Sequence, residues 1–203
     1  MKLKPIITIL ICSAVVIFGI FFVTRNSETM EKVTISADYP KYDTLENLVD
    51  RADTIIKGKI IDFTYRNLNI TQEVNSDDEY LNPGGKIDDS TTPYTVYTIK
   101  IEKAYKGDYA ENDVIEVKQL GGIIGNIEYA LEDSIDAKLE KEHKYVFFLE
   151  TYADSPASLL NPLQASYEYD ENDNIVTSKK WKSNEQNKIN FTMQELENML
   201  ISK

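Results

Sequence analysis

Cysteine and histidine are nearly absent from this chain, and their scarcity excludes several kinds of chemistry. The 203 residues include one cysteine, Cys12, and one histidine, His143. Because Cys12 lies inside an apolar run, the rest of the chain can form neither a disulfide nor a thiolate metal site. A single histidine excludes zinc sites built on two histidines. The sequence also has no Gly-x-Ser-x-Gly turn, the setting of the serine nucleophile in α/β-hydrolases.

Positive charge is scarce as well. The chain has 34 acidic and 22 basic residues, a formal net charge of −12. Lys2, Lys4 and Arg25 lie in the first 25 residues, which contain no acid, so residues 26–203 carry 34 acids against 22 less 3, or 19, bases and a net charge of −15. Such a surface repels phosphate backbones, and we expect no nucleic-acid partner.

Residues 6–23 form a run of 18 positions without a charge. At 1.5 Å per residue a helix of this length spans about 27 Å, close to the thickness of a bilayer core. Lys2 and Lys4 precede the run and favour a cytoplasmic N-terminus. The sequence therefore predicts a cytoplasmic stub at 1–5, a single-pass transmembrane anchor at 6–23, a tether at 24–43 and an extracytoplasmic domain at 44–203. Secretion after cleavage is the alternative, although no Ala-x-Ala-like site follows the run.

The rest of the chain predicts a mainly β domain with short helices at its ends. Thr44 opens an amphipathic helix at 44–53, and Thr192 with Glu195 forms a capping box for another at 192–201. The expected strand 54–65 switches its apolar face near Gly58, which indicates a bend or bulge. The expected strand 144–152 is apolar on both faces and should be central. The expected strands are 54–65, 94–107, 113–120, 144–152 and 166–177.

Three segments remain less defined. Residues 26–42 are polar and irregular. Residues 123–143 have apolar residues at every fourth position, but they follow Gly121 and Gly122 and include Gly125. The loop 66–93 is rich in Asn, Asp, Gly and Pro, and a loop this long is either functional or disordered.

Short curved strands with helical flanks predict a small antiparallel barrel, with a two-sheet sandwich as the alternative.

Several short motifs follow one another from Ala52 onward. The segments ADTIIKGKIID, YTVYTIKIEKAYKGD, VIEVKQLGG and EHKYVFFLE occur in this order, followed by Asn-Pro-Leu-Gln at 161–164. This order resembles uncharacterised exported or membrane-anchored proteins of Gram-positive bacteria. It is also loosely similar to netrin-like and metalloproteinase-inhibitor domains, which implies an OB-like barrel. Those inhibitors chelate the enzyme's metal through an amino-terminal cysteine that this chain lacks, so inhibition is not implied. Glu142 or His143 also replaces a glycine frequent in the group.

Few residues suggest a binding or catalytic site. The run that begins at Asp170 starts like a calcium loop, but Ile175 and Trp181 replace the glycine and glutamate that such a loop needs, which favours a hairpin turn. No metal or cofactor is expected. The 13 tyrosines suit either strands or a binding face. The expected binding surface comprises Tyr80, Tyr94, Lys180 and Trp181, the last two in the basic run 179–182.

Together these features favour a non-catalytic binding module outside the membrane, with a cell-envelope protein or polymer as its partner. An anchor, a compact β domain and exposed loops on a rigid scaffold support this interpretation. Two alternatives stay open. An exported hydrolase of cell-wall glycans would use a pair of carboxylates, and an inhibitor of an extracellular protease would use the loop 66–93.

Overall fold

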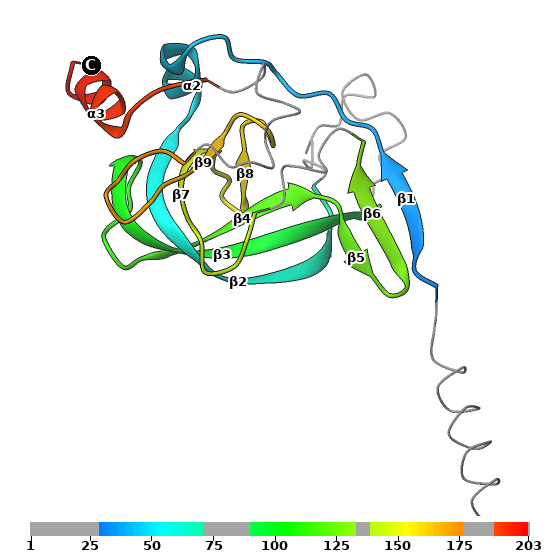
Figure 1. The fold of residues 1–203 in the computed structure, drawn as a ribbon. Helices are drawn as coiled ribbons and strands as arrows, with labels where there is room; N and C mark the ends of the chain where they lie inside the picture. Colours follow the sequence, from blue (N-terminus) through cyan, green and yellow to red (C-terminus); the bar gives the residue numbers. More distant parts are fainter. Residues whose placement is uncertain (1–28, 71–89, 133–138, 177–188, 203) are drawn as a thin grey trace, which may run out of the picture. The chain divides into compact units, whose positions relative to one another are not determined.

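The computed structural model describes residues 29–70, 90–132, 139–176 and 189–202 (Figure 1). The chain divides into two compact units, Met1–Glu31 and Lys32–Lys203. The predicted stub and anchor lie outside the described residues, as do residues 71–89 of the predicted long loop. Within the described ranges, no helix has both the length and the apolar character needed to cross a membrane.

The described part is mainly β, as predicted. The two described helices are α2 (Leu45–Arg51) and α3 (Met193–Ile201), and both lie within predicted helical segments. The long strands also match predictions, whereas β1, β5, β6 and β8 were not predicted as strands. The strands are β1 (Glu31–Ile35), β2 (Thr54–Leu68), β3 (Thr92–Lys106), β4 (Val114–Leu120), β5 (Gly122–Ile124), β6 (Ile127–Leu131), β7 (Lys144–Glu150), β8 (Ala157–Leu159) and β9 (Ser166–Glu168).

Five of these strands pair in a ring. The larger sheet has the order β2-β3-β4-β8-β7-β9, and β2 also pairs with β7. All neighbours in the ring are antiparallel except β4 and β8. The ring closes unevenly: β2 and β3 pair over most of their length, whereas the register of β4 and β8 joins Val117 to Ala157 and Lys118 to Ser158.

The strand β2 bends where the sequence predicts it. Its register with β3 shifts between Lys57 and Gly58 and again between Ile60 and Asp62. A Cβ atom at Gly58 would lie 2.7 Å from the carbonyl oxygen of Lys100. Glycine therefore lets β3 approach β2 closely at the bulge, and the extra curvature helps the sheet to close.

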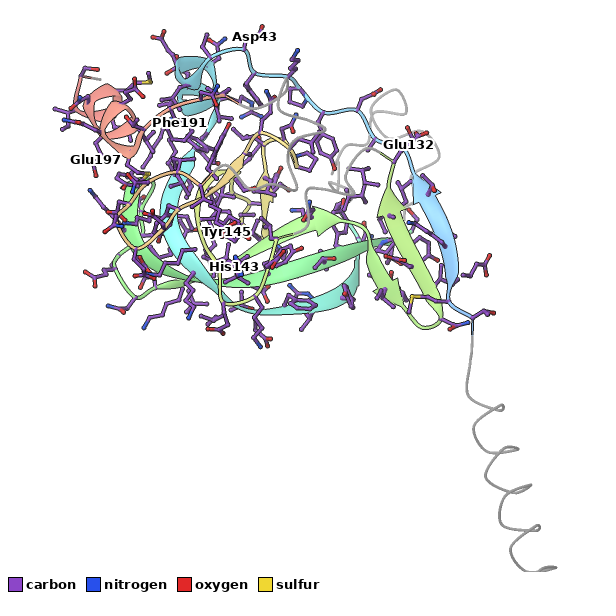
Figure 2. The ribbon with its side chains drawn as sticks, in the orientation of Figure 1. Asp43, Glu132, His143, Tyr145, Phe191 and Glu197 are labelled. Carbon is purple, nitrogen blue, oxygen red and sulfur yellow. The ribbon has the colours of Figure 1, made fainter. Side chains whose placement is uncertain are left out.

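The core surrounds β7, whose residues Val146, Phe147, Phe148 and Leu149 are all fully buried. This confirms the central strand expected from its apolar pattern. Phe191, just before α3, packs edge-to-face on Tyr167 with ring centroids 4.7 Å apart (Figure 2). The same ring lies 6.1 Å from that of Phe148, so it fastens the C-terminal segment to the barrel.

The capping box predicted for the C-terminal helix is present. The Thr192 hydroxyl accepts a hydrogen bond from the Glu195 N–H at 3.2 Å, and the Glu195 carboxylate accepts one from the Thr192 N–H at 2.7 Å. On the helix surface, Glu197 pairs with Lys103 of β3 at 2.7 Å (Figure 2). The helix is thus held both by its cap and by its contacts with the barrel.

A second, three-stranded sheet has the order β1-β6-β5 and lies at the end of the barrel away from α2 and α3 (Figure 1). It corrects one expectation, because the irregular structure predicted for 26–42 is wrong over Glu31–Ile35. It also resolves the segment 123–143 in part, since β5 and β6 form a hairpin through a turn at Gly125. Residues 133–138 of that segment lie outside the described part.

Candidate binding surface

Of the four residues expected to form a binding surface, Tyr94 alone lies among the described residues. It is part of β3 and is 9% exposed. Burial raises the pKa of its hydroxyl, and neighbouring Tyr152 raises it further. Tyr80, Lys180 and Trp181 lie outside the described part. Tyr94 is therefore buried, and the exposed tyrosine near it is Tyr152.

A cavity of about 500 Å³ opens between the start of β4 and the loop that follows β7. Two exposed apolar side chains stand at this cavity, Val114 at 56% and Tyr152 at 40% exposure. Large apolar side chains grouped at a hollow are typical of binding surfaces. The lining consists of Arg66, Leu68, Tyr109, Val114, Ile115, Glu116 and residues 151–157.

The loop that follows β7 is fastened at its first residue. Thr151 donates two hydrogen bonds to Asp53 Oδ2, one from its backbone N–H at 2.8 Å and one from its hydroxyl at 3.0 Å. Asp53 is itself fixed, because its N–H donates to the carbonyl oxygen of Leu149. The loop therefore leaves the barrel in a defined direction.

Lys118 fastens the same loop at its other end. Its ammonium group donates to Ser155 Oγ at 3.0 Å and to the carbonyl oxygen of Pro156, and it lies 4.1 Å from the ring centroid of Tyr152. These contacts satisfy a lysine that is only 7% exposed. Burial lowers the pKa of Lys118 to about 8, although the charge of Glu150 opposes that shift.

Lys118 is buried although it lies on the outer face of the barrel. Alternation along β4 predicts that Lys118 points outward with Glu116, and it does leave the inner face of the barrel. The loop at 151–156 then folds over it, because the parallel pairing of β8 with β4 brings this loop across the outer face. Alternation along β4 therefore predicts the face on which Lys118 lies but not how exposed its side chain is.

An ion pair forms part of the cavity wall. Arg66 Nη2 lies 2.6 Å from Glu116 Oε2, and both side chains are half-exposed. Arg66 Nε is buried and has no hydrogen-bond partner among the described residues. Arg66 and Glu116 neutralise each other, and the cavity lining combines this ion pair and Asp154 with apolar side chains.

The only histidine lies in a separate polar cluster. His143 Nδ1 is 2.9 Å from Glu168 Oε1, its Nε2 is 3.5 Å from Glu140 Oε2, and its ring stacks on Tyr145 (Figure 2). The ring is half-exposed. Among the described residues, no group of three or more His, Cys, Asp or Glu side chains could hold a metal ion.

The carboxyl groups with shifted pKa values in the described part are all shifted downward. Hydrogen bonds from Lys141 and Lys59 lower the pKa of Asp62 and of Glu142. Hydrogen bonds from the backbone N–H groups that follow it lower the pKa of Asp170, which forms the predicted hairpin turn. The Thr192 N–H does the same for Glu195. Such groups stabilise turns, caps and surface pairs in their charged form.

Val114, Tyr152 and Lys118 were not predicted from the sequence as binding-surface residues. One signal was available for Tyr152, which ends the expected strand 144–152 three residues after its buried run stops at Leu149. An aromatic residue at such a strand end is well placed for a binding contact.

Neither a known protein family nor a curated protein matches this sequence.

Proposed function

We propose that this chain is a membrane-anchored, extracytoplasmic and non-catalytic interaction module that binds a cell-envelope protein through the cavity beside β4. The observation that carries the proposal is Tyr152, an exposed aromatic ring held in place by Lys118 and by the Asp53–Thr151 hydrogen bonds. A side chain that is ordered before binding loses less conformational entropy on association. Tyrosines of this kind are frequent among the residues that dominate interface energetics.

The strand order supports a finer description of the fold, an OB-like barrel. The ring β2-β3-β4-β8-β7 contains one parallel pair, β4 with β8. Barrels of the OB type bind ligands on the face of their second and third strands, between the loops that follow the first and fourth strands. In this chain those strands are β3 and β4, and the loop after the fourth strand is residues 151–156, which line the cavity.

A protein fits this surface better than a nucleic acid does. The excess of acidic residues in 26–203 opposes phosphate backbones. Val114 and Tyr152 supply apolar contact area, and the Arg66–Glu116 pair can exchange hydrogen bonds with a polypeptide.

Cross-linking in cells tests the proposed surface. With the photoreactive residue benzoylphenylalanine at Val114, we expect a discrete adduct that weakens strongly when Tyr152→Ala is added. The matched control places the same group at Val176, an exposed position on another hairpin, where we expect no such adduct. Equal adducts at the two positions, or an adduct indifferent to Tyr152→Ala, would contradict the proposal.

The proposed membrane orientation, with the domain outside, is based on the apolar run at 6–23 and on the charges of Lys2 and Lys4 before it. Protease added to intact protoplasts should digest residues 32–203, while a tag fused to the N-terminus stays protected. Digestion of both ends only after lysis would place the domain in the cytoplasm instead. Release of the domain into the medium would favour cleavage and secretion.

A further inference from the structure

A second hollow lies between the barrel and the three-stranded sheet, with a volume of about 190 Å³. Strand alternation separates it from the cavity beside β4. Tyr65 and Thr95 line this hollow, whereas their chain neighbours Arg66 and Tyr94 point to the other face. We call it the tyrosine groove, and its lining residues are Lys32, Tyr65, Thr95, Tyr97, Glu128, Tyr129, Ala130, Leu131 and residues 119–123.

The rings of the tyrosine groove are held in place. Phe63 packs edge-to-face on Tyr65 at 5.6 Å between centroids and lies 6.2 Å from the ring of Tyr97. The Tyr97 hydroxyl donates to Gln119 Oε1 at 3.3 Å. Contacts within the barrel therefore hold Tyr65 and Tyr97 without a ligand, and Tyr129 of β6 lines the same small volume.

Two glycines bring polar backbone close to these rings. A Cβ atom at Gly122 would lie 2.7 Å from Tyr65 Cδ1, and one at Gly121 would lie 2.6 Å from the carbonyl oxygen of Tyr129. The Gly121 carbonyl oxygen accepts a hydrogen bond from Thr95 Oγ1 at 2.9 Å. The Thr95 hydroxyl and the backbone at 121–122 thus lie among the tyrosines that line the groove, and a Cβ atom at Gly122 would press on the Tyr65 ring.

Size and charge restrict the occupant. At about 190 Å³ the hollow has room for a group as small as one six-membered ring. The lining contains one basic and one acidic residue, Lys32 and Glu128. An anionic ligand would meet both Glu128 and the excess negative charge of the domain.

We propose that the tyrosine groove binds a single pyranose ring of an uncharged glycan. The axial C–H groups of a pyranose can lie on a tyrosine face, while its hydroxyl groups exchange hydrogen bonds with side-chain and backbone amides. This site goes beyond the protein-binding cavity proposed above and lies on the opposite face of the same strands. The module would then contact a glycan and a protein at once.

Saturation-transfer NMR on the full chain tests the site, with N-acetylglucosamine and glucose as probes and a detergent that lacks a sugar headgroup. We expect saturable binding of at least one probe and about tenfold or greater loss with Tyr129→Ala or Tyr65→Ala. Tyr129→Phe keeps the ring and should bind as the parent does. Glucuronic acid, which carries a charge, should bind more weakly than glucose.

Two controls separate this site from the protein-binding cavity. Tyr105→Ala removes a half-buried tyrosine of β3 that does not line the groove and should leave sugar binding unchanged. Tyr152→Ala should abolish the cross-linked adduct at Val114 and leave sugar binding intact. The proposal is overturned if neither sugar binds, if Tyr129→Ala and Tyr65→Ala both bind like the parent, or if glucuronic acid binds as tightly as glucose.

Discussion

The side chain of Gln164 holds the backbone of Tyr42 at two points. Its Nε2 donates to the Tyr42 carbonyl oxygen at 2.8 Å, and its Oε1 accepts from the Tyr42 N–H at 2.9 Å. Gln164 is 2% exposed. The Gln164 side chain thus makes the two backbone hydrogen bonds with Tyr42 that a neighbouring strand would otherwise make, although the two residues are 122 positions apart in sequence.

The neighbouring asparagine extends this attachment. Asn161 Nδ2 donates to the Pro40 carbonyl oxygen at 2.9 Å, while its Oδ1 accepts from the backbone N–H groups of Leu163 and Gln164. The motif Asn-Pro-Leu-Gln at 161–164, which contributed to the sequence resemblance, therefore has a structural role here. It fastens residues 40–42 to the barrel.

Gln164→Ala should cost about 2–4 kcal/mol of unfolding free energy, because it leaves the buried N–H and C=O of Tyr42 without partners. Urea unfolding of the full chain measures the loss, and hydrogen exchange should show faster exchange of the Tyr42 amide. Gln194→Ala, on the exposed face of α3, is the matched control and should stay within about 0.5 kcal/mol of the parent. Similar stability of the two variants would contradict the attachment.

Phe147→Ala should cost about 3–5 kcal/mol, since Phe147 is fully buried in the central strand. Val176→Ala, at a 38% exposed position, should change stability by less than about 1 kcal/mol. Thermal unfolding of both variants checks the comparison. A melting temperature for Phe147→Ala equal to that of the parent would mean that the core is assigned incorrectly.

Gly121→Ala should destabilise the domain by about 1–3 kcal/mol. Gly121 has a φ of +96°, and its new Cβ atom would meet the Tyr129 carbonyl oxygen. Gly125 has a φ of +60°, but a Cβ atom there would have no neighbour within 4 Å, so Gly125→Ala should cost about 1 kcal/mol or less. Chemical denaturation of both variants measures the two losses of unfolding free energy. Because both glycines have a positive φ and only Gly121 has a close neighbour, equal losses would contradict the close approach of Tyr129 to Gly121.

Lys118 should make stability depend on pH above neutrality. Its pKa is about 8 in the folded chain and near the ordinary 10.5 in the unfolded chain. Between these values the unfolded chain binds more protons, so the unfolding free energy rises with pH; below about pH 8 this contribution is flat. Relative to Lys118→Met, the parent should gain about 1–2 kcal/mol between pH 7.5 and pH 9.5. A constant difference between parent and variant would show that Lys118 titrates normally.

Local patterns predicted the elements whose packing follows from their own periodicity. The apolar run at 145–149 and the capping box at Thr192 depend on neighbours within a few residues, and the switch of apolar face near Gly58 is likewise visible in the local sequence. Each was therefore accessible from the sequence. The barrel strands β2, β3, β4 and β7 belong to the same group.

The elements that sequence reasoning missed depend on distant partners. The strand β1 consists of five residues and joins the sheet through β6, as in the hydrogen bond from the Glu132 N–H to the Ile35 carbonyl oxygen. The strand β8 has three residues and fills a gap between β4 and β7. The cavity depends on this strand too, because the loop 151–156 crosses β4 only when β8 pairs between β4 and β7. No local pattern could place Lys118 beneath that loop.

The pairing of Leu68 with Thr92 has a consequence for how this domain can diversify. The chain leaves β2 and returns to β3 at directly opposed positions, so whatever connects them begins and ends at a closed hairpin. Lengthening such a connection costs only about 0.6 kcal/mol for each doubling, and the strand register below it need not change. The connecting segment can therefore be exchanged or extended while the paired strands and the tyrosine groove keep their geometry.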